Sequence, residues 1–486
     1  MPFIQHWLTL RRTFVVIFVL GLFLMASRNV GDPDFWWHLR TGQLILQNHA
    51  VFHTDPYSFT RHGQPWVSHE WLSEVLIYLL YRGASWLGLI LAFGAVTGVT
   101  FLLLYRRCAG QPYLAAILTL WGAIASQSTW GVRPHTLSLL LASVFLVILE
   151  KSAIRKSVLW CTIPLMLLWV NLHAEYALGI GVMAIFWLGL VLDCVFGFSH
   201  WPETLPRLKR LGVAILACLS VVPLNPNGVR LFVYPLETIQ SKSMQRYIDE
   251  WASPNFHLHE QIPLLLLILA VIGLVAFSPR KLRPRELLLL TVTLAAALQS
   301  GRHVGIFVLV AVPIMSELGI AIIDENGWGL RERPGPPGLT AALLNMAILI
   351  GFCSFAVLRV LYVAKQQSEV EAKAFPAAAV AYIDANHPPG PILNNPNWGG
   401  YLIWKLYPDY AVFIDGRADL YGDDFLDELA STYLVQSSRW ERVLEEWNIR
   451  TVFLPPDAPL ISVLAKRAGW KQLYADHSAV LMTRGP

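Results

Sequence analysis

The chain has 486 residues, of which 55% are hydrophobic and 14% charged, with a formal net charge of +4. Soluble proteins carry roughly 25% charged residues, so these charges are too few to cover two or three soluble domains. The apolar stretches run for about 17–22 residues, long enough for a helix to cross a hydrocarbon layer ~30 Å thick. The composition excludes a soluble enzyme and predicts a polytopic α-helical membrane protein.

We expect about eleven spanning helices. They are predicted near residues 13–30, 85–105, 112–127, 135–150, 157–172, 176–196, 211–224, 262–278, 286–300, 303–323 and 339–363. Lys and Arg concentrate in the short loops on one side, as at Arg106/Arg107 and 280–285. The positive-inside rule then places the N-terminus in the cytoplasm and the C-terminal end outside the inner (plasma) membrane.

Two outward segments, 31–85 and 223–261, are too long to be simple connectors. In the first, Asp32 is predicted to cap a helix that starts at Pro33 and ends near residue 47. A second helix is predicted from Ser68 to about Arg82, with Gly83 as its stop. Both are rich in aromatic residues and are expected to lie in the membrane interface.

A transmembrane domain is predicted over 1–363 and a small extracytoplasmic α/β domain over 364–486. Strands are expected at 391–393, 411–414, 451–454, 473–475 and 479–482, and helices near 376–386, 398–407, 423–434, 439–448 and 458–468. Their alternation favours a mainly parallel sheet. No Gly-rich phosphate loop and no metal-spaced cysteines mark this domain as catalytic.

Ionisable and amide side chains gather at the outer ends of the predicted spans. They are Asp32, Asp34, His38, Arg133, His135, Asn171, His173, Glu175, Arg302 and His303. Such groups at membrane level usually face one another or an aqueous cavity, so we predict an outward-facing polar cavity. The alternative is that these are loop-end residues whose side chains reach water.

The sequence Gly31-Asp-Pro-Asp-Phe-Trp-Trp-His-Leu after the first span, the stretch Pro65-Trp-Val-Ser-His-Glu-Trp-Leu and the many spans resemble the GT-C superfamily of membrane glycosyltransferases. The segments Asn397-Trp-Gly-Gly-Tyr-Leu and Phe413-Ile-Asp-Gly-Arg are similar to those of a poorly characterised bacterial branch of that superfamily. The Trp-Trp-Asp-Tyr-Gly signature of oligosaccharyltransferases is absent from the C-terminal domain, which disfavours en bloc transfer to Asn.

The resemblance implies an enzyme that moves a sugar from a polyprenyl-phosphate carrier to an extracytoplasmic glycan, lipid or protein. It assigns the role of base or acceptor-orienting group to Asp34, with Asp32 second; Glu175 is a further candidate carboxylate. Substrate-binding candidates are Arg133, His135, Asn171, His173, Arg302, His303, His38, Trp37, His69 and Glu70. Arg302 and Arg133 suit a phosphate leaving group because guanidinium pairs with phosphate oxygens.

Each candidate also has a simpler interpretation. Asp32 and Asp34 stabilise a helix start in any protein, Arg133 can close a span, and 171–175 can be an ordinary turn. The first-loop histidines match no compact ligand motif, so no metal site is predicted; a divalent ion on Asp32 and Asp34 is the alternative.

The expected partners are the lipid-linked sugar, its acceptor and membrane lipids, and no nucleic acid. Two other functions stay open. A transporter or flippase would place polar residues at the midplane and carry paired repeats. A non-enzymatic envelope scaffold would make Asp34 dispensable.

Overall fold

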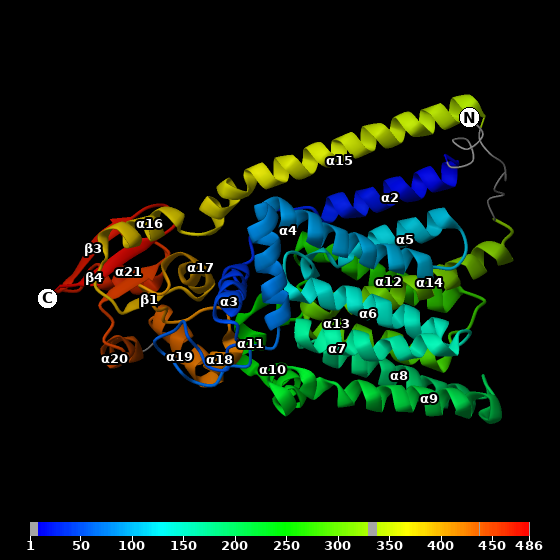
Figure 1. Ribbon diagram of the computed structural model, residues 1–486, viewed down its shortest axis with the longest axis horizontal. Coiled ribbons are helices and arrows are strands. Elements are labelled where there is room, and N and C mark those ends of the chain that lie inside the picture. Colours follow the sequence, from blue (N-terminus) through cyan, green and yellow to red (C-terminus); the bar gives the residue numbers. More distant parts are fainter. Residues whose placement is uncertain (1–7, 329–337, 437, 486) are drawn as a thin grey trace. The chain divides into compact units, whose positions relative to one another are not determined.

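The computed structural model describes residues 8–328, 338–436 and 438–485 (Figure 1). Within these ranges, six helices are long and apolar enough to cross a membrane, and two shorter apolar helices accompany them. The chain is a polytopic helical membrane protein with a small C-terminal α/β part, which confirms the predicted fold class. The predicted number of spans stays a prediction, because length and composition alone do not fix it.

Contacts between residues divide the chain into two compact units, which we call the bundle and the loop–sheet unit. The bundle comprises 1–28, 90–225 and 249–363, and the loop–sheet unit comprises 29–89, 226–248 and 364–486. The predicted division into domains over 1–363 and 364–486 stays a prediction. Most of the segments 31–85 and 223–261 belongs to the same unit as the C-terminal sheet.

The bundle is built from helices that commonly begin with proline in the first turn, where the missing N–H costs nothing. Its elements are α2 (Leu10–Ala26), α5 (Pro112–Ala125), η1 (Gln127–Thr129), α6 (Pro134–Lys151), η2 (Lys156–Cys161), α7 (Thr162–Leu172), α8 (Tyr176–Val195), α9 (Trp201–Ser220), η3 (Val222–Leu224), η5 (Asp249–Trp251), η6 (His259–Gln261), α12 (Ile262–Phe277), α13 (Pro284–Gln299), η7 (Gly301–His303) and α14 (Val304–Glu325). Helices α4 (Trp71–Arg107) and α15 (Leu339–Ala374) begin in one unit and end in the other.

The bundle has a central helix and lipid-facing helices. Helix α14 is buried from Val304 to Ser316 and packs against α5 and α13 (Figure 1). Helix α12, in contrast, leaves Leu266, Leu269 and Ile272 at least half exposed. An apolar surface of this kind is stable in hydrocarbon and not in water.

The first outward segment forms two helices, as predicted, but their ends differ from the prediction. Helix α3 (Phe35–Asn48) starts two residues later than expected, with Asp34 at its N-cap position. Asp32 is therefore no helix cap; its Oδ1 accepts a 2.9 Å hydrogen bond from the backbone N–H of Asp34 and closes the turn before the helix. Helix α4 breaks at Ala84 and Ser85, whose backbone angles are not helical, and not at Gly83.

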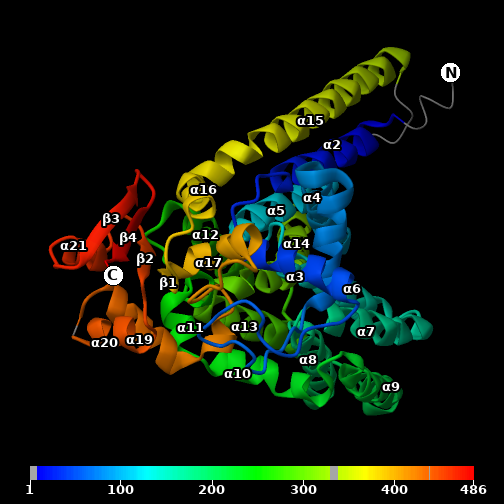
Figure 2. The same ribbon diagram turned by 60° about the vertical axis from the view of Figure 1, so that its left-hand side comes forward.

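The loop–sheet unit contains a four-stranded sheet of order β1-β2-β4-β3 (Figure 2). Its elements are η4 (Gly228–Phe232), α10 (Tyr234–Gln240), α11 (Lys242–Tyr247), α16 (Ala377–Asn386), β1 (Ile392–Asn394), α17 (Pro396–Leu406), α18 (Ala418–Tyr421), α19 (Asp423–Tyr433), α20 (Arg439–Glu446), β2 (Thr451–Leu454), α21 (Pro459–Leu464), β3 (Trp470–Ala475) and β4 (Val480–Arg484). The predicted helices and four of the five predicted strands are confirmed.

The prediction of a mainly parallel sheet was wrong. Only β1 and β2 pair in parallel, with Ile392 opposite Thr451, whereas β4 runs antiparallel to both β2 and β3. The reason is the short β3–β4 connection, in which Asp476 accepts hydrogen bonds from the N–H groups of Ser478 and Ala479. A tight turn of this kind joins only antiparallel strands.

The segment 411–414 is not a strand of the sheet. The N–H of Val412 donates to the carbonyl of Tyr57 at 3.1 Å, and the N–H of Phe59 donates to the carbonyl of Val412 at 3.1 Å. The N–H of Phe413 donates to Oδ1 of Asn394 at 2.8 Å. The segment therefore pairs with the first loop instead of a neighbouring strand, which local propensity does not reveal.

Candidate functional site

In the bundle, charged and imidazole side chains meet at the ends of several helices. This bundle cluster consists of Arg133 (before α6), His135 (α6), His173 (after α7), Glu175 (before α8), Glu250 (η5) and Arg302 (η7). All of them except Glu250 lie at or beside the end of an apolar helix, and Glu250 lies in η5. All except Glu250 were predicted as site residues from the sequence.

Arg302 is the centre of the bundle cluster. Its Nε donates to Oε1 of Glu175 at 2.7 Å and its Nη1 donates to Oε1 of Glu250 at 2.6 Å. Nη2 lies 3.0 Å from Nε2 of His173, which must accept because a guanidinium only donates. Arg133 donates to the second oxygen of Glu250 at 2.6 Å. Two guanidinium groups and two carboxylates thus form one alternating network.

The network fixes the charge states of its carboxylates. Burial alone would raise the pKa of Glu250, but Arg302 and Arg133 outweigh it and lower the pKa to about 2. The pKa of Glu175 is also held well below its usual value, with His135 and Arg302 outweighing the effect of burial. Burial lowers the pKa of His173 to about 4, so this imidazole is neutral near pH 7.

His135 has one nitrogen engaged and one open. Its Nδ1 lies 2.7 and 2.8 Å from the two oxygens of Glu175. Its Nε2 is buried and has no hydrogen-bond partner among the residues that the structure describes. A buried polar atom without a partner is costly, and this one is placed to bind a polar group that enters the cluster.

Two other predicted residues lie in the bundle but carry different contacts. Asn171 is buried and donates from Nδ2 to the carbonyl of Leu167 at 2.9 Å, a bond within its own helix. The ring of His303 stands edge-on to Trp251, with the ring centres 6.3 Å apart. The same indole lies 5.3 Å from the guanidinium carbon of Arg302.

In the loop–sheet unit, the turn that carries Asp34 is held by glycines of the C-terminal part. A Cβ on Gly416 would lie 1.7 Å from Oδ1 of Asp34, and a Cβ on Gly400 would lie 2.6 Å from the carbonyl of Pro33. Only glycine permits these approaches. The Asp32–Asp34 turn therefore packs against the two segments that carry the family resemblance, Asn397–Leu402 and Phe413–Arg417.

Asp34 is half-buried and oriented by its own helix. The Nε1 of Trp37 donates to its Oδ1 at 3.2 Å. The ring of Trp37 in turn covers His38, with ring centres 3.7 Å apart. His38 faces Glu70 and Glu74 at the start of α4, and His69 contacts the other oxygen of Glu70 at 3.6 Å. The structure thus brings Trp37, His38, His69 and Glu70 into one region of the loop–sheet unit.

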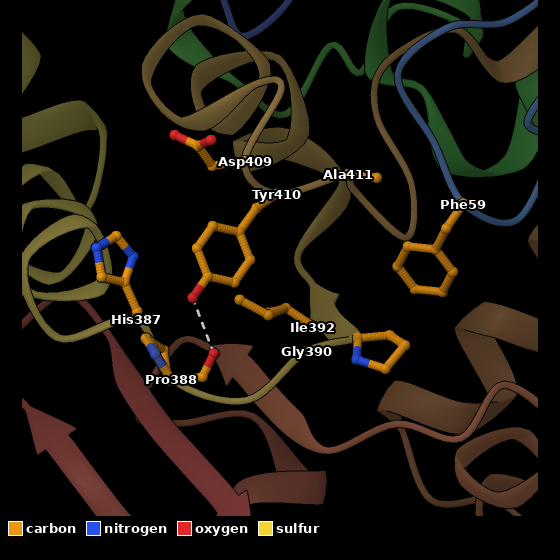
Figure 3. A pocket seen from close by; sticks show the side chains of 9 residues that line it. Phe59, His387, Pro388, Gly390, Ile392, Asp409, Tyr410 and Ala411 are labelled. Carbon is orange, nitrogen blue, oxygen red and sulfur yellow. Dashed lines mark hydrogen bonds between the residues drawn. The ribbon is translucent and has the colours of Figure 1, made fainter.

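An open cavity of about 460 Å³ lies on the α/β part (Figure 3). Tyr410 stands in its middle and donates a 2.8 Å hydrogen bond to the carbonyl of Pro388, while Phe59, His387 and Asp409 lie around it. Aromatic rings beside carboxylate and imidazole groups can bind polar organic molecules. No pattern in the sequence predicts this cavity, because its residues come from separate loops.

No protein-family model matches the sequence, and no curated protein matches it. Solved structures do. The oligosaccharyltransferase of Archaeoglobus fulgidus tethered with an acceptor peptide containing the NVT sequon has 12% identity and a TM-score of 0.56, over 93% of this chain and 70% of its own. The same organism's AglB in complex with an inhibitory peptide and a dolichol-phosphate gives 12% identity and a TM-score of 0.55, over 91% and 69%. ArnT from Cupriavidus metallidurans in the apo state has 14% identity and a TM-score of 0.48, over 98% of both chains.

The chain therefore has the fold of these oligosaccharyltransferase structures, in agreement with the resemblance that the first-loop motifs suggest. At this level of sequence identity the structural similarity defines the fold and does not define the reaction.

Proposed function

We propose that this protein is a membrane glycosyltransferase that moves a sugar from a polyprenyl-phosphate carrier to an acceptor outside the cytoplasm. The observation that supports this most is the bundle cluster, where the partly buried Arg302 and Arg133 lie beside the buried His135 and His173. The solved relatives bind dolichol-phosphate or undecaprenyl phosphate. An anionic carrier requires cationic side chains of this kind.

In the proposed reaction an acceptor hydroxyl attacks the anomeric carbon of the bound sugar. The new bond joins the acceptor oxygen to that carbon, and the bond from the carbon to the phosphate oxygen breaks. Asp34 takes the hydroxyl proton or orients the hydroxyl, and the carrier leaves with its phosphate. Arg302 balances the charge of that phosphate by exchanging its bonds to Glu175 and Glu250 for bonds to phosphate oxygens.

We also propose the orientation predicted from the charged loops. The N-terminus then lies in the cytoplasm and the C-terminal domain lies outside the inner membrane, which suits this reaction. Polyprenyl-linked sugars used outside the cytoplasm are reached only from that face. We propose no cofactor for the transfer step itself.

The test is an envelope-glycan mass profile of a deletion strain complemented with wild type, Asp34→Asn or Arg302→Gln, with membrane levels of each protein measured. We expect wild type to restore a sugar that neither variant restores. Full restoration by both variants would overturn the proposal and favour the scaffold. Build-up of an unflipped lipid-linked sugar in the deletion strain would favour the transporter.

A purified system separates chemistry from transport. Protein in nanodiscs with a radiolabelled polyprenyl-phosphate sugar should transfer the labelled sugar to an acceptor in an added envelope extract. The Arg230→Gln variant should be as active as wild type. Arg230 is the matched control because its salt bridge to Glu237 is exposed.

A further inference from the structure

Three buried ionisable side chains from two helices of the loop–sheet unit face one another, and we call them the first-loop triad. His38 lies on α3, Glu70 directly precedes α4, and Glu74 lies in the first turn of α4. Their exposed fractions are 5%, 6% and 0%. One potential ligand atom of each lies within 4.8 Å of the other two.

The two distances from His38 match those between neighbouring ligands of a metal ion. Nδ1 of His38 lies 3.6 Å from Oε1 of Glu70 and 3.5 Å from Oε1 of Glu74. Charge-assisted hydrogen bonds are shorter, about 2.7–2.9 Å. Metal–ligand bonds of about 2.0–2.1 Å in tetrahedral geometry hold neighbouring ligand atoms roughly 3.4 Å apart. One imidazole nitrogen carries at most one proton, yet here it faces two carboxylates.

Burial makes a cation at this position favourable. The carboxylate of Glu74 is fully buried, and its contacts to Nδ1 of His38 and to the hydroxyl of Ser68 are both 3.5 Å long. An ionised carboxylate that is buried with only long hydrogen bonds costs several kcal/mol. A divalent ion between the three ligand atoms removes that cost and the repulsion between Glu70 and Glu74.

The surrounding structure holds the ligands in place. A Cβ on Gly42 would lie 2.0 Å from the carbonyl of Glu74, so α3 and the start of α4 are in backbone contact beside the triad. The indole of Trp37 covers the His38 ring, and Nε2 of His69 lies 3.6 Å from Oε2 of Glu70. Partners that orient the ligands in this way are typical of protein metal sites.

We infer that His38, Glu70 and Glu74 bind a divalent transition-metal ion of the Zn²⁺ or Mn²⁺ class, which clamps α3 to the start of α4. An imidazole ligand beside two carboxylates favours these ions over Ca²⁺ and Mg²⁺. The site is closed to solvent, so its role is to stabilise the first loop. It goes beyond the proposed glycosyl transfer, and no step of that reaction depends on it.

The test measures metal content and thermal unfolding of the purified full-length protein in detergent. Protein is stripped with EDTA, incubated with Zn²⁺ or Mn²⁺ separately, passed through a desalting column and analysed by mass spectrometry for the metal. Wild type and the exposed-carboxylate control Glu237→Gln should retain about one ion per chain. Glu74→Gln and His38→Gln should lose it. Equal retention by all four proteins, or none by wild type, would overturn the inference.

If the triad variants do not fold, thermal unfolding of wild type with and without metal still tests the site. An ion that binds only the folded chain raises the midpoint of thermal unfolding. We expect EDTA to lower the midpoint of wild type and Zn²⁺ or Mn²⁺ to restore it, whereas Mg²⁺ does not. Identical midpoints under all these conditions would refute the site.

Discussion

The guanidinium of Arg417 donates a 2.7 Å hydrogen bond to the carboxylate of Asp55, 362 positions earlier in the chain. It also donates twice to Asp415, at 2.8 and 2.7 Å, and all three side chains are at most 2% exposed. The rings of Tyr57 and Trp66 lie 5.0 and 4.5 Å from the guanidinium carbon. This buried network joins the first loop to the C-terminal part and gives the Asp-Gly-Arg segment a structural role.

Replacing Arg417 should destabilise the protein strongly. Arg417→Gln leaves Asp55 and Asp415 buried without their counter-charge, a change that costs about 3–5 kcal/mol. Arg417→Lys keeps the charge but loses the forked geometry, so its loss should be intermediate. Thermal unfolding of the purified variants measures this order, with Arg467→Gln, which removes an exposed ion pair, as control. A Gln variant as stable as wild type would show that the network adds no stability.

Gly416→Ala should impair the proposed activity by displacing Asp34. The added methyl group would occupy the place of Oδ1 of Asp34, so the turn must shift. We expect kcat to fall by at least tenfold, because a shift of about 1 Å at a reacting group has effects of that size. Gly31→Ala, which meets no atom within 4 Å, is the matched control. Glycosyl transfer in nanodiscs is the measurement, and an unaffected Gly416→Ala would mean that the position of Asp34 is unimportant.

Arg302→Gln should lower kcat/KM for the lipid-linked donor by about 100-fold or more, because the phosphate loses its main cationic partner. Truncation alone also leaves Glu175 and Glu250 unbalanced, so the double variant Arg302→Gln/Glu250→Gln is needed. The double variant should recover stability and stay inactive. Recovery of activity in the double variant would instead show that Arg302 acts only on the fold.

Stability should fall as the pH drops from 6.5 to about 4. The pKa of His173 is lowered by burial from 6.5 to about 4, so in this window the unfolded chain takes up a proton that the folded chain does not. The contribution of neutral His173 to the free energy of unfolding is therefore complete above pH 6.5 and is lost at about pH 4. His173→Gln, which still accepts from Arg302, should flatten the midpoint of thermal unfolding across this window.

A second loss is expected at lower pH. The pKa of Glu250 is held at about 2 against a usual value of 4.5. Its stabilisation is therefore present above pH 4.5 and disappears as the pH falls toward 2. Glu250→Gln should reduce this second loss, to which Glu175 also contributes, and leave the first one intact. Coincident curves for wild type and variant below pH 4.5 would contradict the assignment.

The sequence by itself determined the membrane class, because long apolar runs with few charges are stable as helices in the hydrocarbon layer and not in water. It also determined most helices of the α/β part and the position of Arg302, Glu175 and His173 at the ends of apolar segments, since each adjoins one. Periodicity and turn chemistry are local properties, and the elements that they define were predicted to within a few residues.

Only the tertiary structure decided which of these residues meet. Glu250 joins Arg302, Arg417 joins Asp55, and Glu74 joins His38 through contacts between segments that are far apart in the chain. The same reason explains the segment 411–414, which pairs with Tyr57 and Phe59 of the first loop and not with a strand. Pairings of this kind depend on burial and on closure of long loops, and neither leaves a periodic pattern in the sequence.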